Sequence, residues 1–289
     1  MTHFETTVGS MEPVSIKLIK EGKVGARLVT YPNGMQAVMK VASSKTTKNN
    51  CAMQRGLPTA KMPMREVAFY RLSKLLGFDV VPETILHTFH GVPASFQQYV
   101  TSARIYDLDQ RLRHPEKNKE AWVIALRETL RDKVPIEDTL RLTVLDFLAA
   151  ARDRHGANYG ARLEISSGKA RWRLIGWDNG CTFGLTQERY HSVGHKYLFR
   201  YAFDLSSVWS ALLSVKRSSL QSAMRGLLDE ESVDHVWHRI QFMISFPHRM
   251  PWKTLSQGSD TPDTFPSYAE FFRPMTASKP FYILQTQAM

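Results

Sequence analysis

The stretch DFLAAARDRHGANYG, residues 146–160, is followed after a short interval by LIGWDNGCTFG, residues 174–184. Asp153 and Asp178 are 25 residues apart (178 − 153 = 25). We expect each to stand at the edge of a regular element, where a loop can hold a side chain over a cleft. Phosphoryl transfer requires one carboxylate that orients the attacking hydroxyl, and oxygen ligands that hold Mg²⁺ or Mn²⁺ against nucleotide phosphates. The pattern therefore favours Asp153 as the orienting carboxylate and Asn158 and Asp178 as the metal ligands.

Upstream of these two motifs, the first hundred residues have the pattern of β-strands. Residues 15–20 and 36–41 are short runs of β-prone residues, and the Asn-Gly of YPNG at residues 31–34 predicts a hairpin between them. Residues 80–87 and 94–100 also have an extended pattern. The first third of the chain is therefore predicted to be rich in strands.

One helix interrupts the predicted strands. Residues 43–63 are polar and rich in Lys, Thr and Asn, which is typical of a loop. The segment that follows carries apolar residues at the helical spacing i, i+4, i+7 and i+8, and Gly77 is placed to end the helix. The apolar residues are Ala68, Leu72, Leu75 and Leu76.

From about residue 105 the apolar pattern becomes mainly helical. A strand-rich part followed by a helical part predicts an α+β fold with two lobes, which we assign to residues 1–102 and 103–289. A cleft between such lobes is a preferred ligand site. The helical stripes lie within residues 122–130, 140–148, 205–212 and 233–240, and residues 170–177 have the pattern of a strand.

The two central motifs resemble the catalytic and metal loops of the atypical kinase superfamily. The order D-R-H-x-x-N, short hairpin, D-N-G is similar to that of the phosphoinositide-lipid kinases, the bacterial HipA-type kinases and the secretory-pathway casein kinases, and it is most similar to the last group. The resemblance implies a bilobal kinase-like fold with Asp153 as the catalytic aspartate and Asn158 and Asp178 as metal ligands. It also implies that His155 belongs to the scaffold of the catalytic loop and can contact the phosphate.

Two N-terminal segments resemble further parts of a kinase nucleotide site. QAVMKV, residues 36–41, is similar to the strand whose lysine, here Lys40, reaches the nucleotide phosphates. REVAFYRL, residues 65–72, is similar to the helix whose glutamate, here Glu66, pairs with that lysine. The pairing has a physical purpose, because a carboxylate fixes a flexible ammonium group before the substrate arrives.

The same resemblance implies a glycine loop and a hinge. The segment E-G-K-V-G is similar to the loop over the phosphates, where Gly22 and Gly25 permit close approach of the backbone. Gln98 and Val100 stand where kinases place the hinge that binds adenine. The order H-R-D-L-x-x-x-N of ordinary protein kinases is absent, so the likeness, over roughly residues 15–185, is to the atypical group.

Composition bears on the partners and the compartment. The net charge of +11 favours acidic partners such as nucleotide phosphates, but the basic residues are dispersed and no nucleic-acid-reading module is recognisable. No run of residues is long and apolar enough to cross a bilayer, and the first residues do not resemble a secretory signal. Cys51 and Cys181 are far apart, so we expect neither a disulfide nor a zinc site, and we expect a cytoplasmic location.

The candidate residues also have purely structural interpretations. Asp153 can pair with an arginine at a helix end, Asp178-Asn179-Gly180 can be a tight turn, and Lys40 can be a surface lysine. A group of basic residues after the second motif can favour an acidic protein or a phosphorylated head group as acceptor, or can simply be solvated. This group consists of His191, His195, Lys196 and Arg200.

Three hypotheses follow from the sequence. The first is an atypical protein kinase that uses ATP and Mg²⁺ or Mn²⁺ to phosphorylate a hydroxyl group of a partner protein. The second keeps this site but phosphorylates a phosphoinositide or another small molecule. The third is a catalytically inert protein that binds a nucleotide and acts as a scaffold. The sequence names neither the acceptor nor the metal, because acceptor choice lies in loops without transferable signatures and both ions accept oxygen ligands.

Overall fold

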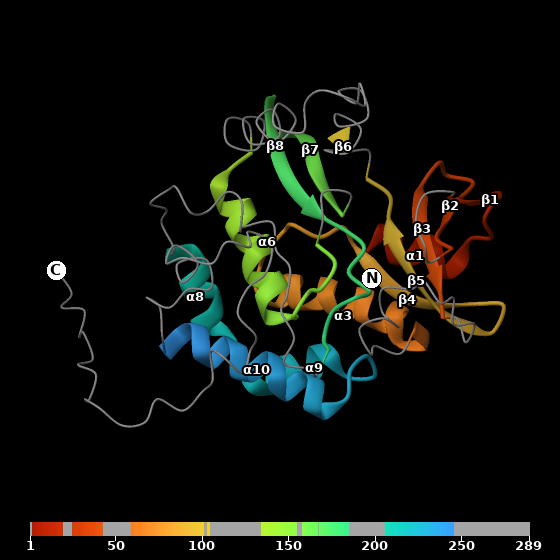
Figure 1. The fold of residues 1–289 in the computed structure, drawn as a ribbon. Helices are drawn as coiled ribbons and strands as arrows, with labels where there is room; N and C mark the ends of the chain where they lie inside the picture. The colour runs from red at the N-terminus through yellow and green to blue at the C-terminus, as the bar shows by residue number, and fades with distance from the viewer. Residues whose placement is uncertain are drawn as a thin grey trace, which may run out of the picture.

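The structure is a computed structural model that describes residues 2–19, 25–42, 59–100, 103–104, 134–154, 158–166, 168–184 and 206–245. Figure 1 shows a strand-rich N-terminal part on the right, a mainly helical C-terminal part on the left and below, and a second group of strands at the top. This arrangement confirms the predicted α+β fold with two lobes. The predicted boundary between residues 102 and 103 stays a prediction.

A five-stranded antiparallel sheet forms the N-terminal part, with the strand order β1-β2-β3-β5-β4. Its strands are β1 (Ser15–Leu18), β2 (Arg27–Thr30), β3 (Gln36–Val41), β4 (Thr84–Phe89) and β5 (Val92–Gln98). The predicted hairpin joins β2 to β3, and Gly34 at its tip has a φ of +80°, which glycine adopts without steric cost. The sequence analysis missed β2, because four residues are too few to show a period, and it placed the start of β4 at residue 80 instead of Thr84.

The predicted helix is α3 (Met62–Leu75), which packs against β4 and β5. Pro63 lies in its first turn, where a missing backbone N–H leaves no hydrogen bond unmade. Gly77 follows the end of the helix with a φ of +67°, as predicted. The prediction of a loop as far as residue 63 is wrong at its end, because a short 3₁₀ helix, η1 (Thr59–Lys61), leads directly into α3. The rest of that predicted loop lies outside the described residues.

A further helix, α1 (His3–Ser10), covers the opposite face of the sheet and was not predicted. Ala37 and Met39 of β3 pack with α1 in one buried cluster. Side chains alternate across a strand, so Lys40 points to the other face, where it meets Glu66 of α3. The sheet therefore lies between two helices, and only the face toward α3 carries the predicted lysine. The α1 residues in the cluster are Phe4 and Val8.

The C-terminal part combines a small antiparallel sheet with four helices among the described residues. They are β6 (Ala103–Arg104), β7 (Tyr159–Ser166), β8 (Lys169–Gly176), α6 (Ile136–Leu148), α8 (Ser206–Ser214), α9 (Arg217–Met224) and α10 (Glu230–Ser245). The helices predicted from three of the apolar stripes are confirmed as α6, α8 and α10, and the predicted strand is confirmed as β8. Helix α9 was missed. The stripe at residues 122–130 lies outside the described residues. Within the described ranges, no helix is both long and apolar enough to span a bilayer.

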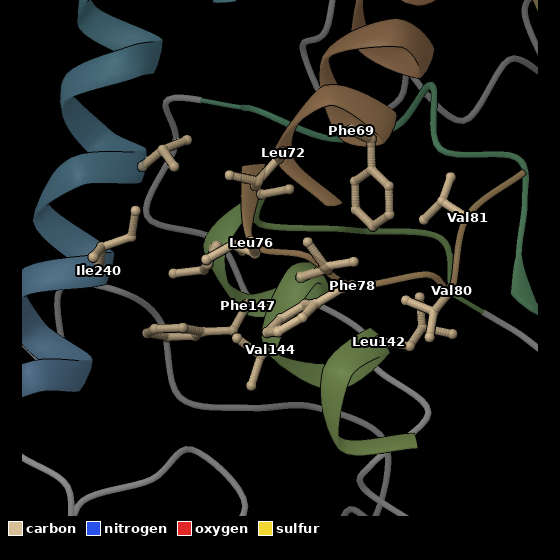
Figure 2. Packing of buried hydrophobic residues seen from close by; sticks show 14 of the residues in the cluster. Phe69, Leu72, Leu76, Phe78, Val80, Val81, Leu142, Val144, Phe147 and Ile240 are labelled. Carbon is tan, nitrogen blue, oxygen red and sulfur yellow. The ribbon is translucent and has the colours of Figure 1, made fainter. Parts of the chain in front are cut away.

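Helices α3, α6 and α10 share one hydrophobic core. Figure 2 shows Leu72 and Leu76 beside Val144 and Phe147 of α6, with Ile240 of α10 approaching the same cluster. Burial of each such side chain stabilises the fold by about 1.5–3 kcal/mol relative to exposure. This packing holds α3 against α6, and α6 leads at its C-terminal end into the loop that carries Asp153.

Candidate active site

The predicted lysine and glutamate face each other between the sheet and α3. Lys40 Nζ donates hydrogen bonds to Glu66 Oε1 and, over 2.6 Å, to Asp178 Oδ1. Burial opposes the charge of Lys40, but the carboxylates of Asp178 and Glu66 outweigh it and raise the pKa of Lys40 above its ordinary value. One ammonium group therefore joins β3, α3 and the loop after β8.

Asp178 lies in a loop whose backbone is strained. Its φ is +56°, and Ala150 and Phe183, which flank the two motif loops, have φ values of +47° and +57°. Such conformations cost a residue other than glycine about 1–3 kcal/mol and concentrate at functional sites. The side chain of Asp178 is 34% exposed, so its carboxylate is accessible from solvent.

Asn158 connects the two motif loops. Its Nδ2 donates to the backbone oxygen of Asp153 over 2.6 Å, and its own backbone oxygen accepts from the N–H of Trp177 over 3.0 Å. Asn158 is buried, while Asp153 is partly exposed. Because Trp177 directly precedes Asp178, these hydrogen bonds connect Asp153 and Asn158 to the segment that carries Asp178.

The oxygen atoms at this position suit a hard divalent cation. Mg²⁺ is usually held by one or two side chains together with substrate phosphates, instead of by a cage made wholly of protein. The carboxylate of Asp178 and the amide oxygen of Asn158 are ligands of this kind. Among the described residues, no group of three or more His, Cys, Asp or Glu residues could enclose a metal ion. The carboxylate of Asp178 and the amide of Asn158 therefore fit such an ion by the chemistry of their oxygen atoms.

Comparisons with known proteins place this geometry in a structural class. No family model matches the sequence, and no curated protein matches it. The solved structure of the Golgi casein kinase with Mn/ADP bound matches with a TM-score of 0.51 and 14% identity, covering 82% of this chain and 72% of that chain. The Helicobacter pylori proinflammatory kinase CtkA matches with a TM-score of 0.50 and 13% identity over 82% and 92% of the two chains. Hydra Fam20 with sugar matches with a TM-score of 0.50 and 12% identity over 84% and 88%. The chain has an atypical kinase-like fold.

Within this kinase-like fold, one buried residue of the site was missed by the sequence analysis. Arg154, next to Asp153, bonds to the fully buried Asp146 of α6 and to backbone oxygens of both motif loops. The D-R-H motif contained the signal, but the sequence analysis considered an arginine only as an ion-pair partner of Asp153 and gave Arg154 itself no role. The structure instead places Arg154 at the centre of the polar interior behind the catalytic loop.

Asn179 was also missed, and it ties the loop after β8 to α3. Its backbone N–H donates to Glu66 Oε2 over 2.9 Å, and its Oδ1 accepts from Arg154 Nη2 over 2.6 Å. The next residue, Gly180, packs so closely against Met62 that a Cβ atom at Gly180 would lie 2.9 Å from its methyl carbon. Glycine at this position lets the loop reach Glu66.

The predicted glycine loop lies between β1 and β2. The N–H of Ile19 donates to the oxygen of Ala26 over 2.9 Å and closes this hairpin. Gly25 has a φ of +68°, a conformation that glycine adopts without steric cost. Gly22 lies outside the described residues, so its predicted role is a proposal only.

One residue of the predicted hinge, Gln98, already uses its backbone N–H in a hydrogen bond within the N-terminal part. The backbone N–H of Gln98 donates to the oxygen of Glu83 over 2.7 Å, so it is not available to adenine. Val100 is partly exposed, and its role stays a prediction. His155 and the basic group of residues 191–200 lie outside the described residues.

Cys181 corrects one prediction. It is buried three residues after Asp178 and is disulfide-bonded, so the expectation that the chain has no disulfide is wrong. Its backbone oxygen accepts from the N–H of Arg152 over 3.1 Å, which links the metal loop to the catalytic loop. The only other cysteine in the sequence, Cys51, lies outside the described residues. A cytoplasmic location stays a prediction, and the disulfide removes one of its supports.

Proposed function

We propose that this chain is an ATP- and Mg²⁺- or Mn²⁺-dependent phosphotransferase, specifically an atypical protein kinase that phosphorylates a hydroxyl group of a partner protein. The observation that carries this proposal is the meeting of Lys40, Glu66 and Asp178 around one ammonium group. The three residues come from β3, α3 and the loop after β8, and their positions were predicted from the kinase resemblance. A surface lysine in a chance ion pair would not be buried between two carboxylates that are distant in sequence.

Each residue of the site has a defined role in this reaction. Lys40 binds the nucleotide phosphates, and Glu66 holds its ammonium group in place so that little entropy is lost on binding. Asp178 and Asn158 hold the divalent ion, which when bound neutralises charge on the phosphates. Asp153 accepts a hydrogen bond from the acceptor hydroxyl, orients its oxygen toward the phosphate and takes up its proton.

The contacts between these residues agree with those roles. Asn158 donates to the backbone oxygen of Asp153, so the residue proposed to orient the hydroxyl is in direct contact with a proposed metal ligand. Lys40 contacts the other metal ligand, Asp178, from the side of the sheet. The acceptor hydroxyl is thus expected on the Asp153 side of the ion and the nucleotide on the Lys40 side.

Two matched structures support the finer parts of the proposal. The Golgi casein kinase was crystallised with Mn/ADP, which supports a nucleotide and a divalent metal as ligands, and its name states a protein acceptor. The CtkA match is also described as a kinase. We therefore favour a protein acceptor over a phosphoinositide or another small molecule.

Nucleotide binding gives the first test. The purified chain should melt at a higher temperature with ATP and Mg²⁺ or Mn²⁺ together than with ATP in EDTA or with the metal alone. A ligand that binds only the folded state adds about 2.7 kcal/mol of stability at 100 times its Kd. Differential scanning fluorimetry measures this shift, and a non-hydrolysable ATP analogue controls for turnover. An unchanged melting temperature with every nucleotide at millimolar concentration would remove both the kinase and the nucleotide-scaffold hypotheses.

A further inference from the structure

Arg154 contacts the backbone of one proposed metal ligand and the backbone of the residue directly before the other. Nη1 donates to the backbone oxygen of Asn158 over 2.8 Å and to that of Trp177 over 2.7 Å. The first oxygen belongs to a proposed metal ligand, and the second belongs to the residue directly before the other ligand, Asp178. A single nitrogen atom therefore fixes the separation between the backbones that carry the two ligands.

The guanidinium group is itself held rigidly. Its Nε lies 3.1 and 3.3 Å from the two carboxylate oxygens of Asp146, and Nη2 lies 3.0 Å from the nearer one. The ring of Phe69 from α3 lies 5.5 Å from the guanidinium carbon. The side chain is 2% exposed, and Gly176 leaves space for it, because a Cβ atom there would lie only 3.3 Å from Nη1.

A second series of contacts connects Arg154 to Lys40. Nη2 donates to Asn179 Oδ1 over 2.6 Å, and the backbone N–H of Asn179 donates to Glu66 Oε2 over 2.9 Å. Glu66 in turn accepts from Lys40. Every contact in this series is a hydrogen bond, and Arg154, Asn179 and Glu66 are all buried.

We propose that Arg154 is a positioning residue that sets the placement of Asn158 and Asp178 and thereby the metal affinity of the site. This inference rests on the proposed function. Only arginine supplies planar N–H donors in a fixed fork that can bind a carboxylate, a side-chain amide and two carbonyls at once. A buried ion pair is weak evidence for stability alone, so its value here lies in the geometry that it imposes on the two loops.

The test compares Arg154→Lys with a matched control, Arg173→Lys. Arg173 is also largely buried and bonds to a buried aspartate at the other end of α6, because its Nε lies 2.6 Å from Asp138 Oδ2. Among the described residues, the other partners of its guanidinium group are Asp79 and Glu164, which lie outside both motifs. Mn²⁺ affinity in the presence of ADP is measured by electron paramagnetic resonance, with the melting temperature of each variant as the measure of folding.

Arg154→Lys is expected to weaken Mn²⁺ binding by roughly 10- to 100-fold, the range seen when residues that orient metal ligands are replaced. The Mn²⁺ affinity of Arg173→Lys should stay within about 2-fold of that of the wild type. This substitution can lower the stability of the fold, but it does not alter the placement of the metal ligands. A double variant, Asp146→Leu with Arg154→Met, removes both buried charges together and should show the same weakening if the lysine variant does not fold.

The outcomes separate the two claims. If the wild type binds Mn²⁺ with ADP and folded Arg154→Lys binds it equally well, the positioning role is overturned and the proposed function stands. If Arg173→Lys weakens Mn²⁺ as much as Arg154→Lys, the effect is one of general stability and the inference is again overturned. If the wild type binds no Mn²⁺ with ADP, the proposed function itself fails.

Discussion

Replacement of Asp153 by alanine should lower turnover by roughly 10²- to 10⁴-fold, the usual contribution of a positioned general base. Binding of ATP with the metal should stay close to that of the wild type, because the acceptor hydroxyl takes no part in that measurement. In the structure, the backbone oxygen of Asp153 accepts from Asn158 Nδ2, and the alanine substitution leaves this backbone contact in place. Initial rates at saturating ATP and metal, together with calorimetric ATP affinity, check both parts of the result.

A control for this variant is Asp79→Ala. The Asp79 side chain is 71% exposed, and its carboxylate lies 4.0 Å from Arg173 Nη1, so its loss should change neither rate nor affinity measurably. Full activity in a folded Asp153→Ala protein would show that the D-R-H motif does not form the catalytic loop.

Replacement of Asp178 by asparagine should abolish phosphate transfer and also remove the gain in nucleotide affinity that the metal provides. If Asp178 holds the divalent ion, loss of this charged ligand would remove several kcal/mol of stabilisation, so we expect turnover to fall by roughly 10³-fold or more. Asparagine is the right substitute because it tolerates the left-handed φ of +56° at this position, whereas alanine would add backbone strain. Nucleotide titrations with and without Mg²⁺ measure the loss.

The two aspartate variants are expected to differ in metal-dependent nucleotide binding, so a comparison between them tests both roles. Asp153→Ala should retain metal-dependent nucleotide binding, while Asp178→Asn should lose it. Lys40 keeps Glu66 as a partner in the second variant, so no buried ammonium group is left alone and folding should be preserved. Equal metal dependence of nucleotide binding in Asp178→Asn and the wild type would rule out Asp178 as a metal ligand.

The sequence was sufficient to predict those residues of the site that belong to local motifs. Lys40 and Glu66 were found because each stands at a fixed place in a strand or helix pattern. The kinase resemblance implied the pairing of Lys40 with Glu66, but the contact of Lys40 with Asp178, 138 residues away, was not predicted. Asn179 was missed because its partners, Glu66 and Arg154, lie 113 and 25 residues away and leave no local signal.

The elements that were missed are short or contain few strong helix or strand formers. Helix α1 is rich in Thr, Ser and Gly and is helical mainly because its apolar side chains cover the sheet. Helix α9 has eight residues and only a few apolar side chains. The disulfide at Cys181 could not be predicted either, since spacing along the sequence does not report distance in the fold.

The most direct test of the central claim follows the γ-phosphate of labelled ATP. The wild type is incubated with labelled ATP and Mg²⁺ or Mn²⁺ in the presence of a host protein extract and phosphoinositide vesicles, with Asp153→Ala as the blank. We predict metal-dependent label on Ser, Thr or Tyr residues of a protein, including the chain itself, none in the lipid fraction, and almost none with the variant. Label confined to lipid would contradict the protein acceptor. Label that stays on ATP throughout, although ATP and metal bind, would contradict the phosphotransferase assignment and leave a nucleotide-binding scaffold.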